Sequence, residues 1–261
     1  MPSLRPALLV PWLADWTYLK EHDAFNQTFD VSLHLGTLLA VALYFWADIV
    51  RILAAFGRSV ARRRVVEGDE RIAWFVLIAT IPALLIGGLA EDAIAEHLGD
   101  PWQIAICLAV FGVLLFVADR TRATRRMQDL GPGTALLVGL AQSIALLPGT
   151  SRSGITITAA RFLGLSRDEA ARFSFYLLIP TVLAAVVYKG VKDVLLGDLP
   201  PGWGGPFLVG TIAAAGSGLL AIDLLLGYVR RYSYSPFVVY RILAAIAILI
   251  LIAAGVREAG F

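Results

Sequence analysis

The sequence predicts an all-α, polytopic membrane helical bundle. Apolar side chains make up 58% of the 261 residues and charged side chains only 16%, whereas roughly a quarter of an average soluble domain is charged. The mean hydropathy is +0.75. This composition excludes a disordered chain and an ordinary cytosolic enzyme. The arginines lie in short, interrupted clusters, which argues against a nucleic-acid binder although the isoelectric point is near 8.8.

Six segments are long and apolar enough to cross a bilayer, which takes roughly 17–25 mostly apolar residues in a helix. We expect these spans at residues 31–50, 72–90, 102–118, 172–189, 206–229 and 238–255. One buried helix of a soluble protein can imitate a single span, but six of them in a short chain favour a membrane protein. We therefore expect a single integral membrane domain over residues 1–261.

Two further apolar stretches, residues 133–147 and 154–164, are too short to cross the bilayer. A helix rises about 1.5 Å per residue, so each reaches only partway through the hydrocarbon. The polar run between them is Pro148-Gly149-Thr150-Ser151-Arg152-Ser153. Irregular backbone at membrane depth is tolerated only where protein encloses it or where it lines a wet cavity. We therefore expect residues 133–164 to form a re-entrant helical hairpin whose tip is a functional site.

The distribution of arginines agrees with this topology. The arginine-rich loops 57–71 and 119–132 are separated by two spans and therefore lie on one side of the membrane, which we expect to be cytoplasmic. The loop between those spans, residues 91–100, carries acidic residues and no Lys or Arg. A hairpin that enters and leaves from the cytoplasm keeps Arg167 and Arg172 on the same side. A single crossing would reverse the later signs, so the pattern favours the hairpin.

The spans also predict an inverted repeat. Three spans precede the hairpin and three follow it, so the two halves have opposite orientations, an arrangement that places sites near the membrane midplane. We expect residues 1–130 to be an incomplete first repeat and residues 131–261 to be the second. Residues 7–19 are suited to the second arm of a first hairpin, and the first arm is absent from the sequence.

The residue types at the hairpin tip predict anion binding. A helix that begins after a glycine-containing turn offers unpaired N–H groups and the positive end of its dipole. Arg152 adds a fork that matches phosphate oxygens. An arginine at the bilayer centre costs about 2.5–3.5 kcal/mol on insertion scales, and an anionic ligand would offset that cost. The alternative is an ordinary polar loop whose arginine reaches the headgroups. By spacing alone, the motif predicts a phosphate or carboxylate ligand.

Other polar residues within the apolar segments have open interpretations. The amide of Gln142 either braces the tip loop or makes a helix–helix hydrogen bond. Asp223 is either functional or paired with Arg241 or a headgroup. We interpret Arg241 as an interfacial anchor and His34 as a packing or capping residue. No His, Cys and carboxylate cluster has metal-ligand spacing, so no metal ligand is assigned.

The stretch Leu147–Thr156, LPGTSRSGIT, resembles the PGxSRSxxT signature of the bacterial undecaprenyl-diphosphatases, also called the bacitracin-resistance family. Further segments that resemble the family are residues 29–46, 78–89, 137–157, 173–180 and 235–242, so the resemblance covers nearly the whole chain. It implies a multi-pass enzyme of the bacterial plasma (inner) membrane. This enzyme would dephosphorylate undecaprenyl diphosphate to undecaprenyl phosphate, the lipid carrier of cell-wall synthesis. A homodimer is a further expectation, and no nucleic acid is expected as a partner.

The resemblance also implies roles for residues of the hairpin. The residues expected to be catalytic are Arg152, which would grip the diphosphate, Ser151 and Thr156. The residues expected to bind substrate are Gly149, Thr150, Ser153 and Gln142. The family further implies a divalent cation, Mg²⁺ or Ca²⁺, for which the sequence does not identify ligands.

One part of the family pattern is missing from the sequence. The family's other half-site is a Glu-x-x-x-Glu motif followed by Ser-Ser-x-x-His, and residues 8–16 resemble what comes after that stretch. Neither His22 nor His34 occupies the position of the family histidine. Two interpretations follow: the coding sequence begins upstream of Met1, or the chain is a homologue without turnover. The alternative functions are a polyprenyl-phosphate carrier or flippase and a non-catalytic lipid-binding protein.

Overall fold

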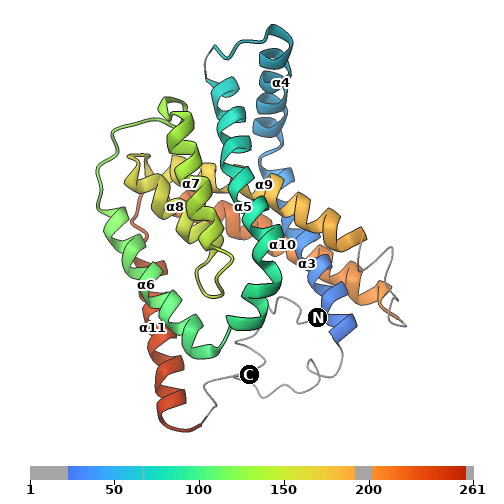
Figure 1. The fold of residues 1–261 in the computed structure, drawn as a ribbon, viewed down its shortest axis with the longest axis vertical. Coiled ribbons are helices and arrows are strands. Elements are labelled where there is room, and N and C mark those ends of the chain that lie inside the picture. The colour runs from blue at the N-terminus through green and yellow to red at the C-terminus, as the bar shows by residue number, and fades with distance from the viewer. Residues whose placement is uncertain (1–22, 67, 192–201, 257–261) are drawn as a thin grey trace.

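The computed structural model describes residues 23–66, 68–191 and 202–256. Every regular element in these ranges is a helix, which confirms the predicted all-α class. The helices are α3 (Asp23–Tyr44), α4 (Trp46–Arg62), α5 (Asp69–His97), α6 (Pro101–Asp119), the short 3₁₀ helix η1 (Met127–Asp129), α7 (Pro132–Ile144), α8 (Arg152–Phe162), α9 (Arg167–Lys189), α10 (Gly204–Val229) and α11 (Ser235–Ala253) (Figure 1).

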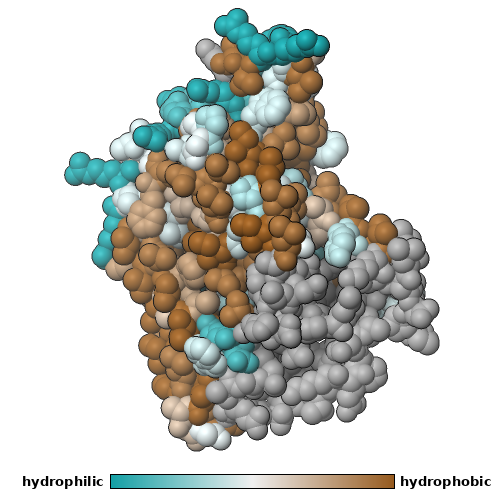
Figure 2. Space-filling view, in the orientation of Figure 1, coloured by the Kyte–Doolittle hydropathy of each residue, from teal (hydrophilic) through white to brown (hydrophobic). Residues whose placement is uncertain are grey.

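Within the described residues, five helices are long and apolar enough to cross a membrane, and they correspond to the second through sixth predicted spans. They are Asp69–Leu89, Pro101–Asp119, Arg167–Tyr188, Gly204–Val229 and Ser235–Ala253. Only 22–44% of the apolar window of each helix is buried inside the protein, so most apolar side chains face outward. Figure 2 shows these side chains covering the middle of one face, with hydrophilic residues gathered at the upper end. A surface this apolar requires lipid rather than water around it, and the chain is a multi-pass membrane protein.

The first predicted span, residues 31–50, is wrong as a single helix. The chain bends by 80° at Phe45, between α3 and α4. Phe45 is 2% exposed, and its ring lies 5.5 Å from the ring of Tyr176. Asp48, in the first turn of α4, accepts a hydrogen bond from the Tyr176 hydroxyl at 2.9 Å. Contacts with α9 therefore fix a break that the apolar count does not reveal. Because α4 continues to Arg62, the first part of the predicted loop 57–71 is helical as well.

The predicted pair of short helices is present. α7 has 13 residues and α8 has 11, lengths of about 20 and 17 Å, and both are too short for a bilayer core of about 30 Å. The chain reverses between them at residues 145–151 (Figure 1). α7 also lies against α5, since a β-carbon on Gly139 would be 2.4 Å from the carbonyl oxygen of Ala79. Entry of this hairpin from one membrane side stays a prediction.

Charged residues hold the open end of the hairpin. The Arg161 side chain of α8 is buried and donates to backbone carbonyls at the end of α6 and just after it, those of Asp119 at 3.1 Å and of Thr121. The Asp119 carboxylate accepts hydrogen bonds from Arg167 of α9 and from the backbone N–H of Tyr234. Burial raises the pKa of the Tyr234 hydroxyl, which stays protonated and donates to the Arg167 carbonyl at 2.9 Å. These bonds join α6, α8, α9 and the start of α11.

One continuous apolar core joins helices from both predicted repeats. It includes Ala40 of α3, Ala79 of α5, Val138 of α7, Phe173 of α9 and Leu226 of α10. Both arms of the hairpin are packed into this core, through Val138 of α7 and Ile157 of α8. The division into repeats at residues 130 and 131 stays a prediction.

Candidate anion-binding site

The tip of the hairpin is a tight turn pressed against α6. Gly149 has φ +87°, and a β-carbon there would lie 2.6 Å from the carbonyl oxygen of Ile104. Both its conformation and the available space therefore require glycine. Ser151 has φ 64°, a left-handed conformation that is uncommon for serine and typical of constrained functional segments. The local sequence thus specifies this turn rather than a continuous helix.

The turn ends by capping α8. Ser151 is the N-cap residue, and its Oγ accepts a hydrogen bond from the Gly154 N–H at 3.3 Å. The Ser153 hydroxyl lies 3.4 Å from the Ser151 hydroxyl. Arg152 is the first residue of the helix. Its positive charge therefore adds to the positive end of the helix dipole.

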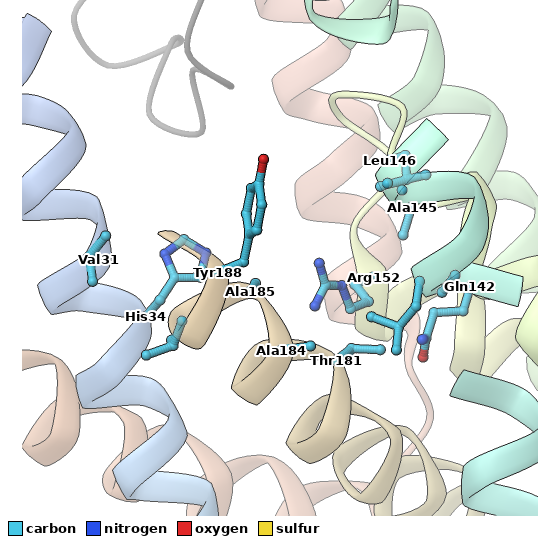
Figure 3. Close-up of a pocket in the computed structure, with 15 residues that line it drawn as sticks. Val31, His34, Gln142, Ala145, Leu146, Arg152, Thr181, Ala184, Ala185 and Tyr188 are labelled. Atoms are coloured by element: carbon cyan, nitrogen blue, oxygen red, sulfur yellow. The ribbon is translucent and has the colours of Figure 1, made fainter. Parts of the chain in front are cut away.

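A cavity of about 350 Å³ lies between α3, α5, α7, α8 and α9. Its polar lining residues are His34, Gln142, Arg152, Thr181 and Tyr188, and the others are apolar side chains or glycine. Figure 3 shows the Arg152 guanidinium pointing into this cavity from the start of α8. A mainly apolar cavity with a few convergent polar groups is typical of a small-molecule site.

The Gln142 amide is an unsatisfied polar group in the cavity wall. Its side chain is 2% exposed, and neither the amide nitrogen nor the amide oxygen has a partner within the described residues. It therefore neither braces the tip loop nor bonds a neighbouring helix, which were the two sequence interpretations. Buried amides are normally hydrogen-bonded. An unpartnered amide beside Arg152 is suited to contact a bound ligand.

Arg152 has no counter-charge from the part of the chain that the structure describes. The ion pairs found there belong to other arginines, Arg51, Arg62, Arg167, Arg172 and Arg230. An unpaired guanidinium beside an apolar cavity is costly unless an anion compensates it. The arrangement can therefore hold a phosphate or carboxylate group.

The remaining predicted site residues lie around the tip rather than in the cavity lining. Thr156 is 1% exposed, donates to the Arg152 carbonyl at 2.9 Å and lies 2.7 Å from the Ser174 hydroxyl of α9. Gly149, Thr150, Ser151 and Ser153 form the turn and the first residues of α8. The structure thus brings Arg152 and Gln142 together at one cavity. The catalytic and binding roles of these seven residues stay predictions.

In the last spans one sequence interpretation is wrong, and one of the alternatives for Asp223 is excluded. Arg241 is not an interfacial anchor, because it is 7% exposed and donates to the Thr150 carbonyl at 3.1 Å. It does not pair with Asp223, which accepts a hydrogen bond from the Tyr44 hydroxyl at 3.2 Å. The available signal was an arginine inside an apolar run, a feature that marks functional positions in membrane helices.

Three further lining residues were not assigned to the site from the sequence. His34 was interpreted as a packing or capping residue, yet its ring lies at the cavity (Figure 3). Thr181 and Tyr188 come from α9, and the Thr181 hydroxyl donates to the carbonyl of Leu177 at 2.7 Å. The signal for Thr181 was its position directly after Pro180, a proline inside a helix.

The described residues supply no complete ligand set for the divalent cation that the family resemblance implies. Within residues 23–66, 68–191 and 202–256, no group of three or more His, Cys, Asp or Glu side chains could hold a metal ion. We therefore derive no step through a metal. The expectations for residues 7–19 and 8–16 and for His22 lie outside the described residues.

The family model described as bacitracin resistance protein BacA matches residues 7–247. An undecaprenyl-diphosphatase of Anaeromyxobacter sp. (strain Fw109-5) is 46% identical over 240 residues, which cover 91% of this chain and 78% of that protein. The undecaprenyl-diphosphatase of Pelotomaculum thermopropionicum is 39% identical and covers 97% of this chain and 90% of its own length. The one from Teredinibacter turnerae is 45% identical, with 85% and 83% covered.

Proposed function

Because the chain belongs to the bacitracin resistance protein BacA family, we propose that the cavity at the tip of the α7–α8 hairpin binds the diphosphate of undecaprenyl diphosphate. The protein is an undecaprenyl-diphosphate phosphatase, a hydrolase that converts this lipid to undecaprenyl phosphate. The product is the lipid carrier that cell-wall synthesis reuses.

The observation that carries the proposal is the unpaired Arg152 guanidinium at the start of α8, directed into the cavity (Figure 3). A diphosphate presents several anionic oxygens, and a guanidinium binds two of them at once. The N-terminus of α8 adds unpaired N–H groups to the same region. The amide of Gln142 supplies a further donor in the wall.

The side chains of the site have two roles, binding of the headgroup and stabilisation of its negative charge. In the hydrolysis, a water oxygen bonds to the terminal phosphorus while the P–O bond to the lipid-linked phosphate breaks. Arg152 neutralises charge on the diphosphate and stabilises the charge that develops on the lipid-linked phosphate as it leaves. Gln142 orients the headgroup through its N–H donors. The apolar walls from α5 and α9, including Leu84 and Ala185, suit the start of an isoprenoid chain.

We place the protein in the bacterial plasma membrane, because its lipid substrate belongs to cell-wall synthesis. The outward apolar faces of its five spanning helices support a location in lipid. The hairpin would enter from the side that carries the arginine-rich loops. The divalent cation and the homodimer stay predictions. The mass of the purified protein in detergent tests the homodimer.

The test is phosphate release from undecaprenyl diphosphate by the purified full chain in detergent, with Mg²⁺, with Ca²⁺ and with a chelator. We expect one inorganic phosphate per lipid, and we expect Arg152→Ala to abolish the release. The relatives' name does not favour a carrier or flippase. Movement of the lipid across liposomes without phosphate release would contradict the phosphatase assignment and support a carrier. Tight lipid binding without release or movement would support a non-catalytic lipid binder.

A further inference from the structure

A second buried guanidinium lies behind the hairpin tip, on a different helix from Arg152. Arg241 of α11 is 7% exposed, and its Nη2 donates to the carbonyl oxygen of Thr150 at 3.1 Å. Its Nη1 has no hydrogen-bond partner within the ranges the structure describes. Arg241 is absent from the cavity lining. It therefore reaches the turn from the side of α11 rather than through the cavity.

Gly154 leaves the room that the Arg241 guanidinium occupies, and Gly112 lies at ordinary contact distance from the Arg241 β-carbon. A β-carbon on Gly154, in the first turn of α8, would lie 2.8 Å from the Arg241 Nη2. A β-carbon on Gly112 of α6 would lie 3.5 Å from the Arg241 β-carbon. The guanidinium therefore lies directly against the first turn of α8. Residues of α6, α8 and α11 together form the space around the guanidinium, so the fold provides a specific position for Arg241.

We propose that Arg241 is a positioning residue for the diphosphate site, an inference that rests on the proposed function. By holding the Thr150 carbonyl, Arg241 fixes the turn from which Ser151 and Arg152 follow. The C=O and N–H of a trans peptide point in opposite directions. Because Arg241 holds the Thr150 carbonyl, the Ser151 N–H of the same peptide unit points away from Arg241. This N–H lies at the N-terminal end of α8, where unpaired N–H groups bind anions.

Electrostatics supports the same assignment. In the described part of the chain, no carboxylate pairs with either Arg152 or Arg241. Two arginines and the positive end of the α8 dipole therefore surround the turn without compensation. A group that carries more negative charge gains more from this concentration of positive charge. Arg241 accordingly favours the diphosphate over the monophosphate product.

A purely structural brace would behave differently. If Arg241 only tied α11 to the turn, its loss would lower the melting temperature and leave the lipid affinity of the folded protein unchanged. A positioning role changes the affinity for the diphosphate more than the affinity for the monophosphate. Lysine retains the charge and a donor for the Thr150 carbonyl, so Arg241→Lys should restore part of the affinity that Arg241→Gln loses.

Gly154→Ala provides a variant that keeps Arg241 and displaces it. The added methyl group meets the far end of a flexible side chain, so the guanidinium moves while the backbone stays in place. Alanine also favours the helical conformation over glycine. This variant should therefore fold even if Arg241→Gln does not. Gly216→Ala in α10, where nothing lies within 4 Å of the added β-carbon, is the matched control.

The experiment measures the Kd of undecaprenyl diphosphate and of undecaprenyl phosphate for the full chain in detergent, well below the melting temperature. We expect Gly154→Ala and Arg241→Gln each to weaken diphosphate binding about tenfold, the loss typical of one charge-assisted hydrogen bond, and to weaken monophosphate binding less. The double variant should bind like Arg241→Gln, because both changes remove one interaction, and Gly216→Ala should bind like the parent. Unchanged affinities in Gly154→Ala and in any folded Arg241→Gln, with binding lost in Arg152→Ala, would overturn the inference and leave the proposed function standing. Normal binding by Arg152→Ala would instead overturn the proposed function.

Discussion

The carboxylate of Asp119 lies 2.6 Å and 3.1 Å from two nitrogens of the Arg167 guanidinium, across 48 residues of sequence. Asp119 ends α6 and Arg167 begins α9, directly after the second arm of the hairpin. The pair therefore ties α6 to α9 at the open end of the hairpin. With the open end held, the two short helices carry the tip to the cavity.

Asp119→Asn should destabilise the protein by about 1–2 kcal/mol. The substitution leaves Arg167 without its counter-charge and weakens the bond from the Tyr234 N–H. The Arg167 side chain is 35% exposed, so solvent screening keeps the loss below that of a fully buried pair. Thermal unfolding in detergent measures the change. The Kd of the diphosphate should stay within about twofold for the folded variant. Asp119 lies at the open end of the hairpin and does not line the cavity. An unchanged melting temperature would show that the pair contributes nothing to stability.

Gly139→Ala should destabilise the protein by about 1–3 kcal/mol, the usual cost of overpacking. The new β-carbon would lie 2.4 Å from the Ala79 carbonyl oxygen, so α5 and α7 must separate. Gly133→Ala, in the same helix with nothing within 4 Å, is the control and should be neutral or slightly stabilising. Melting temperatures of the two variants make the comparison. Equal values would contradict the close packing of α5 on α7.

Gln142→Leu should separate stability from binding. Leucine removes a buried amide that has no partner in the described residues, so the melting temperature should stay equal or rise. The Kd of undecaprenyl diphosphate should increase about tenfold or more, because one hydrogen bond to a charged group is lost. Gln128→Leu, at an exposed amide, is the control. If Gln142→Leu binds like the parent, the amide does not contact the headgroup.

The spans after the first could be predicted because apolar length alone determines which helices fit a bilayer. The hairpin could be predicted because Pro148 and Gly149 interrupt an apolar run that is too short on either side. The bend at Phe45 could not. The apolar run continues through it, and the bend depends on contacts such as Tyr176–Asp48, 128 residues apart in sequence.

Part of the site could be predicted from charged residues within apolar segments. Arg152 stands out because a charge at membrane depth needs a ligand or a partner. Gln142 was assigned to the site, but only the fold shows that its amide lacks a partner. The position of Arg241 depends on the close approach of α11 to Gly154 of α8. Local sequence does not encode a contact between those two helices.

The most direct test of the central claim is the Kd of undecaprenyl diphosphate for Arg152→Ala and Arg152→Lys, measured beside their melting temperatures. Loss of a charge-assisted pair costs about 1.5–3 kcal/mol, so Arg152→Ala should weaken binding by roughly tenfold to a hundredfold. Arg152→Lys should be intermediate, because lysine keeps the charge and loses the fork. Both melting temperatures should match that of the parent. A Kd for Arg152→Ala within twofold of the parent value would contradict a diphosphate site at the hairpin tip.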